Sequence, residues 1–231
     1  MVAKSLAAQS PSHLAAFLAC VATAAASLMC QSCAVPSVYA VAPDAPAADA
    51  QWATGEWVLT PESPTAKDGS AYVANVVAIG GGRFLINWKP RDGPGSPDMP
   101  PLSLVARPFE LAGRLFADVT LQQGLIQELA KKYPAFLIPT HVLVRIDRDT
   151  ADSATLALPT YGKARDLAAR QQRSLPMAMS ESDSDVALAL TGDSESVTKF
   201  YEANAGSNEL FGLRMQFQRV KPAQPASPGG R

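Results

Sequence analysis

The sequence predicts a mainly β domain of the α+β class, built on an antiparallel sheet that is strongly bent or closed into an up-and-down barrel, with two or three short helices. Two observations predict it. Apolar and polar residues alternate with a period of two along most of the chain, as in strands that bury one face. Turn residues separate these runs at short intervals, so roughly eight to ten strands join mostly as sequential hairpins, and parallel strand–helix–strand repeats do not dominate.

The first half of the domain contains the clearest strands. The first strand begins at Gly55, and a proline-rich irregular loop covers residues 91–101. Pro108 lacks an N–H group, so its strand is expected to run at an edge or through a bulge there. The two predicted hairpins join residues 71–79 to 83–89 across the triple glycine 80–82, and residues 102–111 to 115–121 across Ala112-Gly113.

The second half mixes strands with short helices. Asp193 precedes an amphipathic segment and is expected to cap it, with Val197, Phe200 and Tyr201 as the buried stripe. The predicted helices are 123–133, 162–170 and 192–204, and the predicted strands are 136–149, 154–159, 175–179, 185–190 and 213–220.

The strand over 136–149 carries His141, the only histidine beyond the N-terminal segment. Alternation divides this strand between two faces, with Phe136, Ile138, Val142, Val144 and Ile146 on one and Leu137, His141, Leu143, Arg145 and Asp147 on the other. The second face is the less apolar one, so the first is expected to build the core.

The N-terminal residues 1–40 are predicted to be a secretory signal. Lys4 is the only charged residue before Asp44, and residues 14–29 carry no charge, which is the order of a basic start and an apolar stretch in such signals. This run of 16 residues is short for a bilayer span, which takes about 20. Cleavage sites of the expected kind follow Ala34 and Ala40. We therefore expect export to the periplasm or cell envelope.

Composition sets the remaining organisation. With 231 residues, 47% of them hydrophobic, the chain can form one domain with a real core, over residues 52–220. Residues 41–51 and 221–231 are poor in core-forming residues and are predicted to be a disordered linker and a disordered tail. After Lys4, 19 basic and 21 acidic residues leave a net charge near −2, and no basic run interleaved with aromatics stands out, so nucleic-acid binding is not expected.

The three cysteines, Cys20, Cys30 and Cys33, all lie within or beside the predicted signal. The domain therefore has no thiol for a disulfide, a nucleophile or a metal site. Cys20 follows Phe17-Leu18-Ala19, the context closest to a lipoprotein signal. Membrane attachment is expected only through a lipid on Cys20 or an uncleaved signal.

Two resemblances follow from these residues. Gly55-Glu56-Trp57 resembles the G-x-W signature of lipocalins, whose tryptophan closes one barrel end. Residues 54–220 resemble a group of uncharacterised bacterial lipoproteins and periplasmic proteins. The residues that carry this second match are Gly55, Trp57, Gly113, Phe116, Asp118, Pro139, His141, Thr191, Phe200, Phe217 and Val220. The resemblance implies export and a lipocalin-like sheet, and it implies no activity.

No recognisable catalytic motif accompanies His141. The chain has no G-x-S-x-G nucleophile elbow, residues 181–185 lack the glycine and glutamate of an EF-hand loop, and the triple glycine joins two strands instead of opening a helix. We therefore assign no catalytic residue, metal or cofactor, and expect His141 to have a hydrogen-bonded structural role. If the sheet closes around a cavity, the ligand-lining candidates are Trp57, Trp88, Phe116 and His141.

Three functions are compatible with these patterns. The first is a non-catalytic exported envelope protein that binds a small apolar or lipid-like ligand inside the sheet. The second is an envelope interaction or accessory protein that acts through a surface, with the loop 91–101 as the candidate. The third is a hydrolase that uses His141. The sequence indicates no oligomeric state.

Overall fold

The computed structural model describes residues 35–62, 72–91, 102–124, 140–171, 176–182 and 185–220. Their strands are β1 (Pro36–Ser37), β2 (Gly55–Pro61), β3 (Tyr72–Gly80), β4 (Arg83–Pro90), β5 (Leu102–Leu111), β6 (Arg114–Leu121), β7 (His141–Arg148), β8 (Ser153–Leu158), β9 (Met177–Ser182), β10 (Asp185–Leu190) and β11 (Leu213–Arg219). The helices are the 3₁₀ helix η1 (Gln51–Ala53) and the α-helices α3 (Tyr161–Arg170) and α4 (Ser194–Ala203). The predicted signal as far as residue 34 (including Cys20), the loop 92–101 and the tail 221–231 lie outside these residues, as does most of the predicted helix 123–133.

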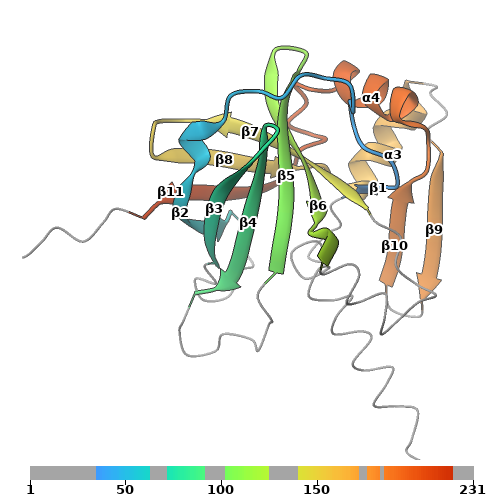
Figure 1. Ribbon diagram of the computed structural model, residues 1–231. Coiled ribbons are helices and arrows are strands. Elements are labelled where there is room, and N and C mark those ends of the chain that lie inside the picture. Colours follow the sequence, from blue (N-terminus) through green and yellow to red (C-terminus); the bar gives the residue numbers. More distant parts are fainter. Residues whose placement is uncertain are drawn as a thin grey trace, which may run out of the picture.

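Eight antiparallel strands close into an up-and-down barrel (Figure 1). Strands β2 to β8 pair in sequence order, and β11 completes the ring between β8 and β2. Short β1 pairs with the first residues of β7 and also with β10, so that the β9–β10 hairpin extends the sheet outside the barrel. The predicted fold class, a lipocalin-like up-and-down barrel with short helices, is confirmed.

The hairpin turns follow the glycine positions. Gly80, Gly81 and Gly82 have φ angles of +86°, +61° and +67°, and Ala112 and Gly113 also have positive φ. A Cβ on Gly82 would lie 2.3 Å from the Cβ of Ala47, so this glycine also permits a close approach of the N-terminal segment. Pro108 lies beyond the part of β5 that pairs with β4, which ends at Ala106, so on that side its missing N–H breaks no ladder.

The strands and helices enclose two hydrophobic cores. The inner core fills part of the barrel, and its buried members are Ala50, Trp57, Leu59, Ala74, Val76, Phe84, Trp88, Val142, Ala154, Leu158, Met215 and Phe217. The outer core lies between the barrel and the helices α3 and α4, and its buried members are Val35, Val41, Phe109, Leu111, Phe116, Leu143, Ala157, Ala164, Ala168, Leu190, Val197, Phe200, Tyr201, Ala205, Leu210 and Phe211.

Helix α4 forms as its sequence predicts. Asp193 caps it by accepting a hydrogen bond from the Ser196 N–H at 2.7 Å, and this bond lowers the pKa of the Asp193 carboxyl. Val197, Phe200 and Tyr201 form the buried stripe, which packs into the outer core.

The N-terminal segment differs from its prediction as a disordered linker. Residues Val35–Ala50, which we call the N-terminal strap, cross the outside of the barrel between β5 and α4 (Figure 1). The Arg107 guanidinium donates to the carbonyl oxygens of Val41, Ala42 and Ala45 at 2.7 to 3.2 Å. The composition of this segment predicts disorder because it is poor in core-forming residues. The contacts that hold it come from distant residues such as Arg107, which composition does not show.

Candidate functional site

Trp57 closes one end of the barrel. Its ring is fully buried, stacks on Phe217 with 4.2 Å between centroids, and has the Arg219 guanidinium 4.3 Å from its centroid. The Trp57 Nε1 donates to the Ala53 carbonyl oxygen at 2.7 Å, which fixes the ring beneath η1.

Polar groups that have partners also lie at this end of the barrel. Arg219 donates to the carbonyl oxygens of Trp52 and Thr54 and to the Asp152 carboxylate. The Arg148 guanidinium lies 4.9 Å from the Trp52 ring centroid. Both arginines are therefore held at the η1 end.

Away from this end, solvent reaches side chains that point into the barrel. Ile86 of β4 faces inward between buried Phe84 and Trp88, and its register partner Leu104 on β5 faces inward with it. Both are partly exposed, as are the inward-facing Val144 on β7, Ile146 on β7 and Leu156 on β8. A barrel completely filled by its own side chains would bury such mid-strand residues. Solvent therefore reaches part of the inward-facing surface of the described strands.

Trp88 lies beside this solvent-reached part. It is 5% exposed, points inward from β4, and meets Tyr72 edge-on with 5.0 Å between ring centroids. Its Nε1 is buried and has no hydrogen-bond partner among the described residues. The interior thus combines partly exposed apolar walls with one unsatisfied donor.

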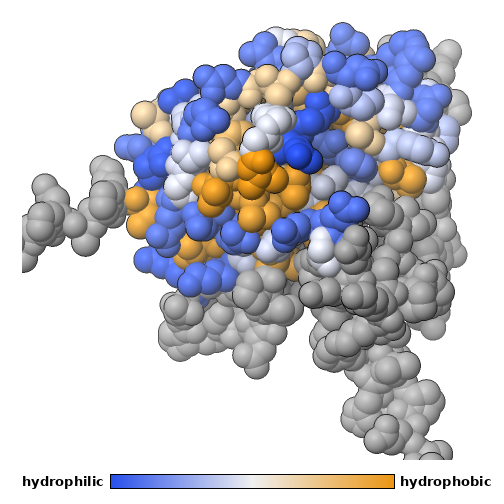
Figure 2. Space-filling model, viewed as in Figure 1, coloured by the Kyte–Doolittle hydropathy of each residue, from blue (hydrophilic) through white to orange (hydrophobic). Residues whose placement is uncertain are grey.

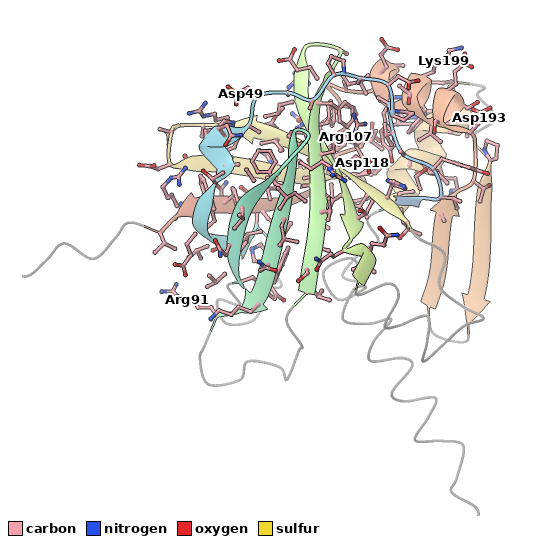
Figure 3. All side chains as sticks on the ribbon, viewed as in Figure 1. Asp49, Arg91, Arg107, Asp118, Asp193 and Lys199 are labelled. Atoms are coloured by element: carbon pink, nitrogen blue, oxygen red, sulfur yellow. The ribbon has the colours of Figure 1, made fainter. Side chains whose placement is uncertain are left out.

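His141 lies on the outside of the barrel. Its Nδ1 is 2.9 and 3.0 Å from the two carboxylate oxygens of Asp118 on β6. Asp118 is 5% exposed and the His141 side chain 23%. Arg107 is the register partner of Asp118 on β5, and Figure 3 shows the two next to each other.

This pair has one feature of a catalytic dyad. A carboxylate on Nδ1 orients an imidazole so that its Nε2 can act as a base. Ser37 is the register partner of His141 across β1 and β7, but its Oγ accepts a hydrogen bond from the Tyr39 N–H. In the described part of the chain no hydroxyl hydrogen-bonds the His141 ring. The contacts that are present join two strands of the barrel wall.

The structure separates the four predicted ligand-lining residues. Trp57 and Trp88 face the interior, whereas Phe116 belongs to the outer core and His141 to the outer face. Phe116 packs against Phe109 and Phe211, with centroids 6.2 and 5.7 Å away. Alternation shows which residues share a face, but it does not show which face points into a closed barrel.

Sequence reasoning missed two contributors. Asp118 was named only among the residues that carry the resemblance, with no role assigned to it. Its position between Phe116 and Thr120 on one strand face already indicates a buried carboxylate that needs a partner. The missing partner of the Trp88 indole has no signal in the sequence, because it depends on every residue packed around that ring.

The described residues lack two kinds of feature. They contain no group of three or more histidine, cysteine or acidic side chains placed to hold a metal ion. Neither α3 nor α4, nor any other helix in this part of the chain, has the length and hydropathy of a transmembrane span.

Comparisons of the chain with protein-family models, curated proteins and solved structures gave no match.

Proposed function

We propose that the protein is a non-catalytic, exported cell-envelope protein that binds a small apolar or lipid-like molecule inside its barrel. The observation that carries this proposal is the partial exposure of inward-facing aliphatic side chains at mid-strand, with Ile86, Leu104 and Val144 as examples. Removing such surface from water gives roughly 25 cal/mol for each Å² that a ligand covers. Trp57 and its partners occupy the η1 end, so we place ligand entry at another part of the barrel.

Export rests on the charge pattern of residues 1–34 and on the lack of cysteine beyond Cys33. The strap bears on where a signal would be cut. Val35 is buried, and the Val38 N–H donates to the Leu190 carbonyl oxygen. A cut after Ala40 would remove β1, whereas a cut after Ala34 keeps it. Within this proposal we favour the cut after Ala34, because it keeps β1 and the buried Val35.

The binding test uses N-phenylnaphthylamine, an uncharged dye that fluoresces in apolar surroundings. We expect the purified protein to enhance its fluorescence and a long-chain alkane to displace it. Leu104→Trp should abolish the enhancement because the larger ring occupies the interior. Val105→Trp is the matched control, since the neighbouring residue on the same strand faces outward and is partly exposed.

Circular dichroism and thermal melting must first show that both variants fold. If overpacking unfolds Leu104→Trp, Leu104→Phe replaces it, with Val105→Phe as its control. Equal dye binding by the inward and outward variants, or none by the wild type, would refute interior binding.

The second candidate function, interaction through a surface, is favoured by one observation. Val77 and Ile79 on the outside of β3 are 44% and 43% exposed. Leu85 on β4 is the register partner of Val77, and Val105 on β5 is the register partner of Leu85. Figure 2 shows apolar side chains gathered on this face of the molecule. The test is to crosslink the wild type and the double variant Val77→Ser/Ile79→Ser to their neighbours in the cell envelope. This function requires that a partner crosslinked to the wild type is lost in the variant.

A further inference from the structure

The buried indole of Trp88 indicates what kind of molecule the barrel takes. An amide-like or indole N–H removed from water without an acceptor is destabilising, and most buried polar atoms in proteins have a partner. The Trp88 Nε1 has none among the described residues, although the ring is 5% exposed. Trp57, the other buried tryptophan of the inner core, donates to Ala53.

The described neighbours of Trp88 supply no side-chain acceptor for its Nε1. Its register partners are Ala74 on β3 and Leu102 on β5, both apolar, and Tyr72 presents its ring to it. The Tyr201 hydroxyl, also unsatisfied, is different because it is enclosed by the fully buried outer core. Trp88 instead lies in the inner core beside Ile86 and Leu104, which solvent partly reaches, so a molecule that displaces side chains around its buried Nε1 could accept from it.

The charges of the interior restrict that molecule further. On the described strands, alternation places three charged side chains on the inward face. Arg148 and Arg219 are held at the η1 end by Trp52, Trp57 and backbone carbonyls, and Glu110 is exposed beside the β5–β6 turn. Nothing charged faces Ile86 or Leu104 from the neighbouring strands. An ionised carboxylate buried beside Trp88 would have no free inward-facing cation on the described strands to pair with, which is strongly unfavourable.

We propose that the ligand is a neutral molecule with a long apolar part and one hydrogen-bond acceptor, such as an ester, ketone or amide carbonyl, which accepts from the Trp88 Nε1. The apolar part lies along Ile86, Leu104 and Val144. This inference rests on the proposed function, because it assigns the chemistry of a ligand held in the same interior. It predicts selectivity for an acceptor, which apolar burial alone does not give.

The test compares three probes of similar length: tridecane, methyl decanoate and decanoate at pH 8. Affinity is measured by displacement of N-phenylnaphthylamine from the wild type, Trp88→Phe and Trp57→Phe. Trp88→Phe keeps an aromatic ring and removes the donor. The readout is the ratio of methyl decanoate affinity to tridecane affinity in each protein, because this ratio cancels the effect of a changed ring on apolar binding.

We expect Trp88→Phe to lower this ratio about tenfold, the worth of one hydrogen bond to a buried donor. Trp57→Phe should leave the ratio unchanged, since that indole already has an acceptor. Decanoate should bind more weakly than its methyl ester. Thermal melting identifies a variant that fails to fold, and Trp88→Leu then replaces Trp88→Phe.

The outcomes separate the two proposals. If the wild type binds methyl decanoate and tridecane but Trp88→Phe keeps the same ratio, the acceptor inference is overturned and apolar binding stands. Tighter binding of decanoate than of its ester would also overturn it. If no probe displaces the dye from the wild type, the proposed function itself fails.

Discussion

The inner and outer cores consist of the same kinds of aliphatic and aromatic residue, but they exclude solvent to different degrees. In the outer core, Phe116, Leu143, Leu190 and Phe211 are almost completely buried beneath the helices and the strap. In the inner core, inward-facing residues such as Ile86 keep partial contact with solvent. The difference indicates that the outer core is the more completely packed of the two, and it is the reason the proposed ligand is placed in the interior.

Polar groups distinguish the two regions in the same way. The outer core contains Arg145, which is 2% exposed and donates to Asp147, Ala205 and Asn208. Its guanidinium also lies 5.0 Å from the Phe211 ring centroid. The buried charge is thus fully engaged by protein groups, whereas the Trp88 indole of the inner core has no described partner.

The largest expected effect compares truncations in the two cores. Phe116→Ala should lower the free energy of unfolding by about 3–5 kcal/mol, because it leaves a cavity between the barrel and Phe211. Ile86→Ala should lower it by only about 1–2 kcal/mol, because Ile86 is already partly exposed. Urea unfolding followed by circular dichroism measures both. An equal loss would remove the distinction between the cores.

A smaller effect is expected at the buried arginine. Arg145→Met keeps the apolar stem but removes the donors to Ala205 and Asn208. The Asp147 carboxylate then keeps only its ion pair with Arg114, whose Nη1 lies 3.7 Å from Oδ1. Loss of these charge-assisted bonds should cost about 2–3 kcal/mol in the same urea experiment. Arg114→Met serves as the control, since that side chain is exposed and should cost less than about 1 kcal/mol. A neutral Arg145→Met would mean that the outer core does not depend on this network.

The smallest effect concerns the one described outer-core side chain with an unsatisfied polar atom, Tyr201. Burial raises the pKa of the Tyr201 phenol, and its hydroxyl lacks a described partner. Tyr201→Phe should therefore stabilise the protein by up to about 1 kcal/mol. A raised pKa means that the folded state holds the proton more tightly, so the free energy of unfolding of the wild type should fall as pH rises above about 10. In Tyr201→Phe this fall should be smaller, because the variant has no phenol at that position to titrate. Identical alkaline denaturation curves would contradict the burial of this phenol.

Much of the fold was predictable because its determinants are local. Alternation and glycine turns placed both hairpins, and the residues that cap and bury α4 were read directly from 193–201. His141 was expected to be hydrogen-bonded, and its partner in the structure, Asp118, lies on a different strand. The contact depends on the pairing of β6 with β7, which the pattern of a single strand does not show.

The rest depends on contacts between distant segments. Leu143 and Arg145 lie on the strand face that looked less apolar, and they are buried because α4 and the residues after it cover that face. The strap is held by groups far away in the sequence, among them Arg107, 62 residues beyond Ala45, and Thr198. Phe116 was placed among the ligand-lining residues because its strand was predicted without knowledge of which face would point inward.

Methyl-labelled NMR tests the central claim most directly, since it observes both cores in one sample. On addition of methyl decanoate, the account predicts shifts of the Ile86, Leu104 and Val144 methyl signals, while those of Leu143, Leu190 and Leu210 stay in place. Shifts confined to the outer-core methyls, or none at saturating ester, would contradict it.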